Sequence, residues 1–244
     1  IWAKVLKEKY NAKSERSLKL RFHAQTAGCS LTAQQPENNI SRTAFQAMAA
    51  VLGGTQSLHT NSMDETLALP SQEAAEIALR TQQLIAFETG ASNVIDPLGG
   101  SWYVEELTNN IEKEVHKYFD KINEIGGVIN GIEMGYFQHE IAESSSAYQK
   151  RVDGKRRIIV GINDFVKNDE KIDIPILEIR KEVLDEQICK LLELKSKRDK
   201  KKVELSISKI ANGCLNGVNL MPLIIDAAKS YATLGEIVNS MKDV

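Results

Sequence analysis

Two polar segments of this 244-residue chain hold most of the side chains that could bind a ligand or move a proton. Their polar side chains are those of His23, Gln25, Gln56, His59, Asn61 and Glu65. Amide groups both donate and accept hydrogen bonds, and an imidazole can also exchange a proton. The set therefore predicts a polar ligand site. The alternative is that these side chains only satisfy buried backbone groups.

Hydrophobic periodicity predicts the elements that must position these groups. Residues 18–26 alternate between polar and apolar, which is the period of a strand, and residues 56–60 form a second short strand. A helix is predicted from residue 39 to Gly53, and another from the N-cap Ser71 to Gly90. The predicted apolar stripe of the first helix is Ile40, Ala44, Phe45, Met48, Val51 and Leu52, and the inward face of the second is Ala74, Ile77, Ala78, Thr81 and Ile85.

The order strand, loop, helix, repeated twice, predicts an α/β unit with two parallel strands. Right-handed crossovers place both polar loops at the same carboxyl edge of the sheet. Ligands bind at that edge in open doubly wound sheets and in barrels alike, so periodicity leaves the two architectures open.

The remainder of the chain is predicted to be mostly helical. Helices are expected over residues 104–125, 131–151, 179–194 and 221–238, with one short strand at 158–161. The Pro/Gly-rich stretch 93–102 predicts a domain boundary. We therefore expect an α/β domain over residues 1–92 and a helical region over residues 93–244.

Composition excludes several classes of protein. The formal net charge of -2 gives no field that would attract nucleic acid or an anionic membrane, and the basic run 195–202 is typical of a solvated helix face. No apolar run is long enough to span a bilayer. The three cysteines are far apart, which argues against disulfides and against a metal site. We expect a cytoplasmic protein without a metal site, a membrane segment or a nucleic-acid partner.

Four segments carry a resemblance to a known family. They read RFHAQTAG (21–28), LTAQQPENN (31–39), RTAFQAMAAVLGGTQSLHTNSMDE (42–65) and DPLGGSWYVE (96–105). The chain resembles the large subunit of the adenosylcobalamin-dependent acyl-CoA mutases, and the likeness extends to residues 219–237. The resemblance implies that the two β/α units are the last two of a TIM (β/α)8 barrel. It also implies adenosylcobalamin as cofactor, an acyl-CoA substrate and a radical carbon-skeleton isomerisation.

The resemblance assigns roles to individual residues. Gln25 and Gly28 match residues that lie against the corrin ring, and His23 matches a histidine at the active site. Asn61 and Glu65 match the pair that faces the adenosyl ribose. Ala68 matches a cofactor-binding alanine. Gln56 matches a glutamine on the coenzyme A side, and Arg16 stands where the family commonly has a lysine. We expect Gln56 and Arg16 to bind substrate.

The resemblance also bears on partners and on the extent of the chain. Because the sequence opens within a helical pattern at Ile1, we expect it to be a fragment, inactive on its own. None of the four histidines lies in the DxHxxG motif that donates a cobalt ligand in this family, so a separate small cobalamin-binding subunit and a hetero-oligomer are expected. The substrate predicted is methylmalonyl-CoA, interconverted with succinyl-CoA. The alternatives are an isobutyryl-CoA mutase or a related acyl-CoA mutase, and a non-catalytic module that binds a cobalamin-binding partner.

Overall fold

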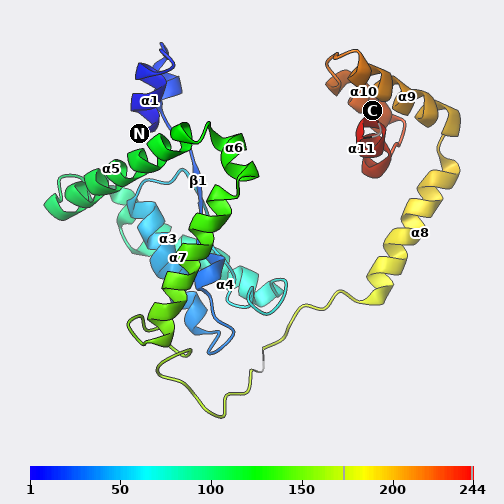
Figure 1. Ribbon diagram of the computed structural model, residues 1–244. Coiled ribbons are helices and arrows are strands. Elements are labelled where there is room, and N and C mark those ends of the chain that lie inside the picture. Colours follow the sequence, from blue (N-terminus) through cyan, green and yellow to red (C-terminus); the bar gives the residue numbers. More distant parts are fainter. Residues whose placement is uncertain (173, 243) are drawn as a thin grey trace. The chain divides into compact units, whose positions relative to one another are not determined.

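The computed structural model describes residues 1–172, 174–242 and 244, and the chain divides into two compact units (Figure 1). Unit 1 is Ile1–Leu177 and unit 2 is Glu178–Val244. The elements of unit 1 are α1 (Trp2–Glu8), α2 (Glu15–Leu18), β1 (His23–Gln25), η1 (Gly28–Ser30), α3 (Asn38–Leu52), β2 (Ser57–His59), α4 (Gln72–Glu88), η2 (Ala91–Asn93), α5 (Trp102–Glu124), α6 (Val128–Glu133) and α7 (Tyr136–Asp153).

The two strands pair in parallel, as the sequence predicts. Ala24 lies opposite Leu58, and the neighbouring pairs keep the same register. Each strand has only three residues, and β1 is shorter than the predicted strand 18–26, whose first residue, Leu18, belongs to α2. The strands are short because, in the described part of the chain, each has a single partner strand and gains ladder hydrogen bonds on one side only.

Helix α3 buries a different face from the one predicted. Its buried residues are Asn39, Thr43 and Ala47, whereas Phe45 is 77% exposed. The other five residues of the predicted apolar stripe are half-buried. The most deeply buried side of α3 lies next to that stripe, because it meets the polar loop after β2. There, the Thr43 hydroxyl donates to the Asn61 carbonyl.

Helix α4 has the cap and the buried face that the sequence predicts. The Ser71 hydroxyl accepts a hydrogen bond from the Ala74 amide at 3.2 Å, which satisfies one of the free N–H groups of the first turn. Its buried residues are Ala74, Ala78, Thr81 and Ile85, while Ile77 is half-buried. The Thr60 hydroxyl donates to the Ala78 carbonyl at 2.7 Å, so the end of β2 is fixed against the middle of α4.

The rest of unit 1 is helical, with local differences from the prediction. Residues 131–151 are not one helix, because α6 ends at Glu133 and α7 starts at Tyr136, after a left-handed Gly135. The predicted strand 158–161 is replaced by an isolated bridge between Val160 and Asp164. Among the described residues no neighbouring strand extends that bridge, so a strand has nothing to pair with.

Unit 2 contains α8 (Lys181–Lys197), α9 (Lys200–Leu215), α10 (Met221–Lys229) and α11 (Leu234–Lys242). Figure 1 shows α10 and α11 beside α9, and their shared core is Ile210, Ala227 and Ile237. The single helix predicted over residues 221–238 is in fact two helices. The chain turns at Tyr231, which has φ 63°, so that both helices can pack on α9.

A partly buried ion pair holds the start of α11. Arg198, whose side chain is 9% exposed, donates from Nη1 to Glu236 Oε2 at 2.7 Å, and its Nη2 donates to the other carboxylate oxygen. Glu236 also accepts from the Thr233 amide and hydroxyl, while its own amide donates to the Thr233 hydroxyl, which is a capping box. The Arg198 guanidinium, together with these Thr233 hydrogen bonds, lowers the pKa of Glu236 to about 2.

The division into units differs from the predicted domains. The structure groups residues 93–177 with the sheet, whereas the sequence places a boundary after residue 92. That boundary concerns the domains of the complete protein, so it stays a prediction. Among the helices of the described residues, none has the length and apolar character needed to cross a bilayer.

The ion pair predicts how the stability of α11 depends on pH. Because the folded-state pKa of Glu236 is depressed, its stabilisation is present above about pH 4.5 and is lost as the pH falls toward about 2. Glu236→Gln should cost about 1 kcal/mol at neutral pH, since partial exposure screens the pair. It should also flatten the acid dependence. Amide hydrogen exchange of residues 234–242, corrected for intrinsic rates, measures both effects.

The matched control for this prediction is Glu193→Gln. Glu193 pairs with Lys197 on the exposed surface of α8, where an ion pair contributes little. An equal loss of protection in the two variants would contradict the assigned role of Glu236.

Candidate functional site

The parallel register brings the two predicted loops together at one edge of the sheet. Gln25, the last residue of β1, lies opposite His59, the last residue of β2. The ladder continues one step further, because the Thr26 amide donates to the His59 carbonyl at 3.1 Å. Gly28 and Asn61 follow on the two loops. A Cβ built on Gly28 would lie 3.4 Å from Asn61 Nδ2, so the two loops are in van der Waals contact.

Asn61 is the link between the two loops. Its side chain is 4% exposed, and its Oδ1 accepts a hydrogen bond from the Thr26 hydroxyl at 2.5 Å. The backbone amide of Asn61 in turn donates to the same hydroxyl oxygen at 2.9 Å. Thirty-five residues separate the two partners in the sequence. The pair therefore fixes the spacing of the two strand ends.

Glu65 is held against Asn61. Asn61 Nδ2 donates to Glu65 Oε2, while Glu65 Oε1 lies 4.0 Å from His59 Nε2. The Glu65 side chain is 24% exposed, so one side of the carboxylate is fixed by the protein and the rest can still reach a ligand. Ala68 follows on the same turn, with its amide bonded to the Asp64 carbonyl. The structure thus brings together the predicted pair Asn61 and Glu65.

His23 and Gln25 lie on the exposed face of β1, on either side of the half-buried Ala24. His23 Nδ1 is 2.6 Å from the Ser57 hydroxyl on the neighbouring strand. This contact holds the ring in one orientation and leaves Nε2 for other partners. Gln25 is two residues further along, on the same face and closer to the Asn61 and Glu65 pair.

Gln56 and Arg16 stand apart from this cluster. The side-chain Oε1 of Gln56 accepts from the Phe22 backbone amide at 2.9 Å, and its Nε2 donates to the Gly54 carbonyl. Both polar atoms of this side chain are thus bonded to backbone groups. Arg16 is exposed on α2, ahead of the amino end of β1. Neither shares a hydrogen bond with the cluster among the described residues. Their substrate-binding roles stay predictions.

Two residues that hold the loops of the site, Asn39 and Arg42, were not predicted from the sequence. Asn39 is fully buried, accepts from the Thr32 amide at 3.0 Å, and donates to the Met63 carbonyl at 2.9 Å. It therefore joins the loop that follows η1 to the loop that follows β2. Arg42 adds a bond to Asn39 Oδ1. The only signal was the pair of asparagines at the start of the predicted helix, and a local cap explains such a pair equally well.

An open groove lies beside η1, the short helix that follows β1. It has a volume of about 610 Å³ and runs from Cys29 and Ser30 in η1 to Tyr148 and Arg157. The Arg157 guanidinium lies over the Tyr148 ring, 4.8 Å from its centroid, which stiffens this wall. The residues that line this groove include none of the strand-end cluster.

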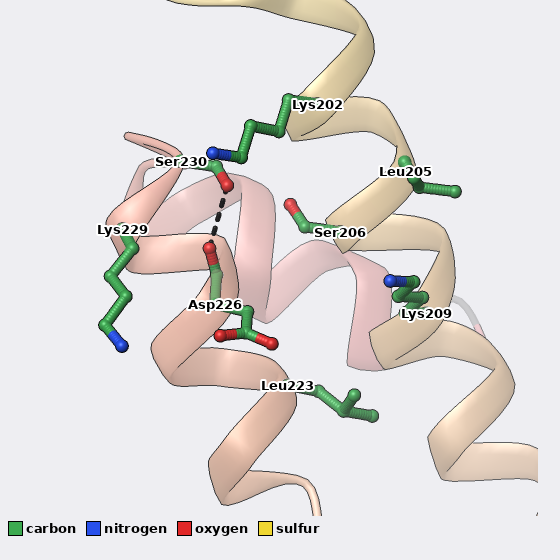
Figure 2. Close-up of a pocket in the computed structure, with 8 residues that line it drawn as sticks. All are labelled: Lys202, Leu205, Ser206, Lys209, Leu223, Asp226, Lys229 and Ser230. Carbon is green, nitrogen blue, oxygen red and sulfur yellow. Dashed lines mark hydrogen bonds between the residues drawn. The ribbon is translucent and has the colours of Figure 1, made fainter.

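Unit 2 has a hollow of its own, of about 240 Å³, between α9 and α10 (Figure 2). Figure 2 shows Asp226 in this hollow with Lys202 and Lys209 on α9 and Lys229 directed outward. The hydroxyl of Ser230 donates to the Asp226 carbonyl at 2.8 Å and that of Ser206 to the Val203 carbonyl, so both are engaged within their own helices. The hollow offers only flexible lysines and one carboxylate. The strand-end cluster is the better candidate site.

Comparison with known proteins agrees with the resemblance. A family model described as "Methylmalonyl-CoA mutase" matches residues 1–244. The chain is 41% identical over 244 residues to a "2-hydroxyisobutanoyl-CoA mutase large subunit" of Aquincola tertiaricarbonis, covering all of this chain and 43% of that protein. It is 41% identical over 245 residues to a "Probable methylmalonyl-CoA mutase, mitochondrial" of Caenorhabditis elegans, covering 33% of it. It is 39% identical over 245 residues to the "Methylmalonyl-CoA mutase" of Rhizobium meliloti, covering 34% of it. In all three matches the chain spans less than half of the relative.

The Thr26 and Asn61 link predicts a specific stability effect. Thr26→Val keeps the shape of the side chain but leaves the buried amide and Oδ1 of Asn61 without their partner. We expect a loss of about 1–3 kcal/mol in the free energy of unfolding, measured by urea denaturation. Thr108→Val is the matched control, because the Thr108 hydroxyl makes only a local bond on the exposed face of α5. Equal shifts in the two midpoints would show that the link does not hold the loops.

Proposed function

The chain belongs to the methylmalonyl-CoA mutase family, and from this premise we propose that the protein containing it is an acyl-CoA mutase. Such an enzyme is an isomerase that rearranges the carbon skeleton of an acyl thioester. The observation that carries the proposal to this chain is the geometry of the strand ends. Gln25 ends β1 opposite His59, and the bonded pair Asn61 and Glu65 follows β2 at the same carboxyl edge, where ligands bind in α/β folds. His23 lies two residues back on the same face of β1.

The residues present fit adenosylcobalamin, a ligand with amide groups around a ring and hydroxyl groups on a ribose. Gln25 is exposed and can both donate to and accept from an amide. Glu65 is held by Asn61 with part of its carboxylate still accessible, so it can accept from ribose hydroxyls. Gly28 places no side chain between the loop and a flat ring. Ala68, on the turn that follows Glu65, is the remaining cofactor-binding residue.

When bound, adenosylcobalamin supplies the radical chemistry of the reaction. The chain contributes orientation and exclusion of water. Asn61 and Glu65 would hold the adenosyl nucleoside, and Gln25 with Gly28 would lie against the ring. His23 would have Nε2 for the reacting groups, because Nδ1 is engaged by Ser57. Gln56 and Arg16 are proposed to contact the coenzyme A part of the substrate.

Methylmalonyl-CoA, interconverted with succinyl-CoA, is the substrate we propose first. The names of the similar proteins include methylmalonyl-CoA and 2-hydroxyisobutanoyl-CoA mutases, at 39–41% identity. Both acyl groups are branched next to the thioester. A closely related branched acyl-CoA is therefore the second candidate. The interpretation as a non-catalytic module has less support, because the similar proteins are named as mutases and the pair matched to the cofactor, Asn61 and Glu65, is hydrogen-bonded at the strand ends.

The architecture of the complete protein is also part of the proposal. The described residues are mostly helical with a small parallel sheet, and we infer that the two β/α units are the last two of a TIM barrel. We further propose a separate cobalamin-binding subunit, since one relative is named as a large subunit. The cytoplasmic location stays a prediction, because several relatives are named as mitochondrial.

The proposed nucleoside contact is tested by cofactor affinity in the full-length protein. Glu65→Ala should weaken adenosylcobalamin binding about tenfold or more, the effect of losing a charged hydrogen bond. Binding of hydroxocobalamin, which lacks the adenosyl group, should change little. Absorbance titrations with both cobalamins measure the two affinities. The matched control is Glu73→Ala, a change at an exposed glutamate in the first turn of α4.

The proposed reaction is tested by turnover. Full-length protein, mixed with a small cobalamin-binding subunit and adenosylcobalamin, should isomerise methylmalonyl-CoA or 2-hydroxyisobutanoyl-CoA, followed by chromatography of the acyl-CoA products. The chain 1–244 alone should show no turnover. Tight subunit binding without any turnover would favour the interaction module, and turnover by the isolated chain would overturn the proposed division of the active site.

A further inference from the structure

Asp64 is a buried carboxylate in the middle of the candidate site, and the roles assigned so far do not use it. It is 1% exposed and lies between Asn61 and Glu65 in the sequence. A buried carboxylate is costly unless its oxygens are hydrogen-bonded. Its contacts therefore indicate what the side chain does.

Asp64 holds both ends of the turn that leads to α4. Its Oδ2 accepts a hydrogen bond from the Ser71 amide at 2.8 Å, at the N-cap of that helix. Its backbone carbonyl accepts from the Leu67 amide at 2.9 Å and the Ala68 amide at 3.1 Å. The backbone bonds close the turn that carries Glu65, and the side-chain bond, the one contact that is specific to an aspartate here, ties this turn to the N-cap of α4.

The other carboxylate oxygen, Oδ1, is buried and has no hydrogen-bond partner among the described residues. An apolar side chain of similar size would avoid the cost of burying that oxygen. It would also give up the bond to Ser71. An aspartate at this position is therefore favoured only if the benefit of fixing the turn exceeds the free-energy cost of burying an oxygen without a hydrogen bond.

The group that the turn positions is Glu65. The Glu65 backbone amide donates to the Ser62 carbonyl at 3.3 Å. After it, the backbone amides of Leu67 and Ala68 donate to the Asp64 carbonyl. The backbone on either side of the Glu65 side chain is therefore fixed. Its carboxylate can then stay on Asn61 Nδ2 without having to be ordered when a ligand arrives.

We propose that Asp64 is a positioning residue that holds Glu65 ready for the nucleoside of the cofactor, acting through the turn and not by touching the ligand. The identity of that ligand rests on the proposed function. The positioning itself rests on the hydrogen bonds of Asp64. The prediction is that loss of the Oδ2 contact reproduces the loss of Glu65.

The test compares Asp64→Ala and Asp64→Asn in the full-length protein by absorbance titration with adenosylcobalamin and hydroxocobalamin. Asp64→Ala should weaken adenosylcobalamin binding about tenfold and leave hydroxocobalamin binding nearly unchanged. Asp64→Asn keeps an oxygen for the Ser71 amide and should restore most of the affinity. Asp153→Ala, at an exposed aspartate of α7, is the matched control.

A double variant separates positioning from a direct contact or a general loss of structure. If Asp64 acts through Glu65, Asp64→Ala should have no further effect on adenosylcobalamin affinity in a Glu65→Ala background. Additive losses would overturn the inference. So would equal losses for both cobalamins, which mean a damaged fold.

Two further variants address the Ser71 bond without altering Asp64. Ser71→Ala removes only the capping hydroxyl, whereas Ser71→Pro removes the hydroxyl and the amide hydrogen, and the φ of -68° at this position suits proline. The proline variant should lose more adenosylcobalamin affinity than the alanine variant, and equal affinities would contradict the inference.

If Glu65→Ala itself leaves adenosylcobalamin affinity unchanged, the proposed cofactor contact fails. If Glu65→Ala weakens it and Asp64→Ala does not, only the positioning role fails.

Discussion

The parallel pairing of two three-residue strands is the constraint on which the candidate site depends. The pairing sets Gln25 opposite His59 at the carboxyl edge, with His23 two residues back, and the Thr26 to Asn61 link extends the alignment beyond the last ladder hydrogen bond. A slip of one residue would turn every side chain of a strand to the opposite face. Because β1 and β2 are so short, the loop hydrogen bonds supply much of what fixes the register.

The interior next to the strand ends is polar, and this explains how it can be buried and also fix the positions of the loops. Asn39, Thr43, Asn61 and Asp64 are all nearly inaccessible, and each has a hydrogen bond to a backbone or side-chain group of the loops. Hydrogen bonds have preferred directions, whereas apolar packing does not, so this interior defines where each loop lies. The unsatisfied oxygen of Asp64 is the cost that accompanies this arrangement.

Unit 2 is stabilised by different means. It has a small apolar core around Ile210 and Ala227, and the ion pair of Arg198 with Glu236 closes the end of the three-helix arrangement. The ion pair also completes the cap of α11, so one carboxylate serves two purposes. Helix α8 takes little part in this core, and its apolar residues Leu184 and Leu192 are exposed in the described structure.

The sequence by itself determined the local features. Alternation predicted the first strand, the order of the elements predicted that the two strands are parallel, Ser71 predicted the start of α4, and the quoted segments indicated the family. Tertiary structure decided which residues meet. The buried face of α3, the break at Tyr231, the partners of Asn61 and the role of Asp64 depend on contacts between residues distant in the chain, such as Thr26 and Asn61. Periodicity records the preference of each segment for a helix or a strand, but it contains no information about which polar group lies opposite another after folding.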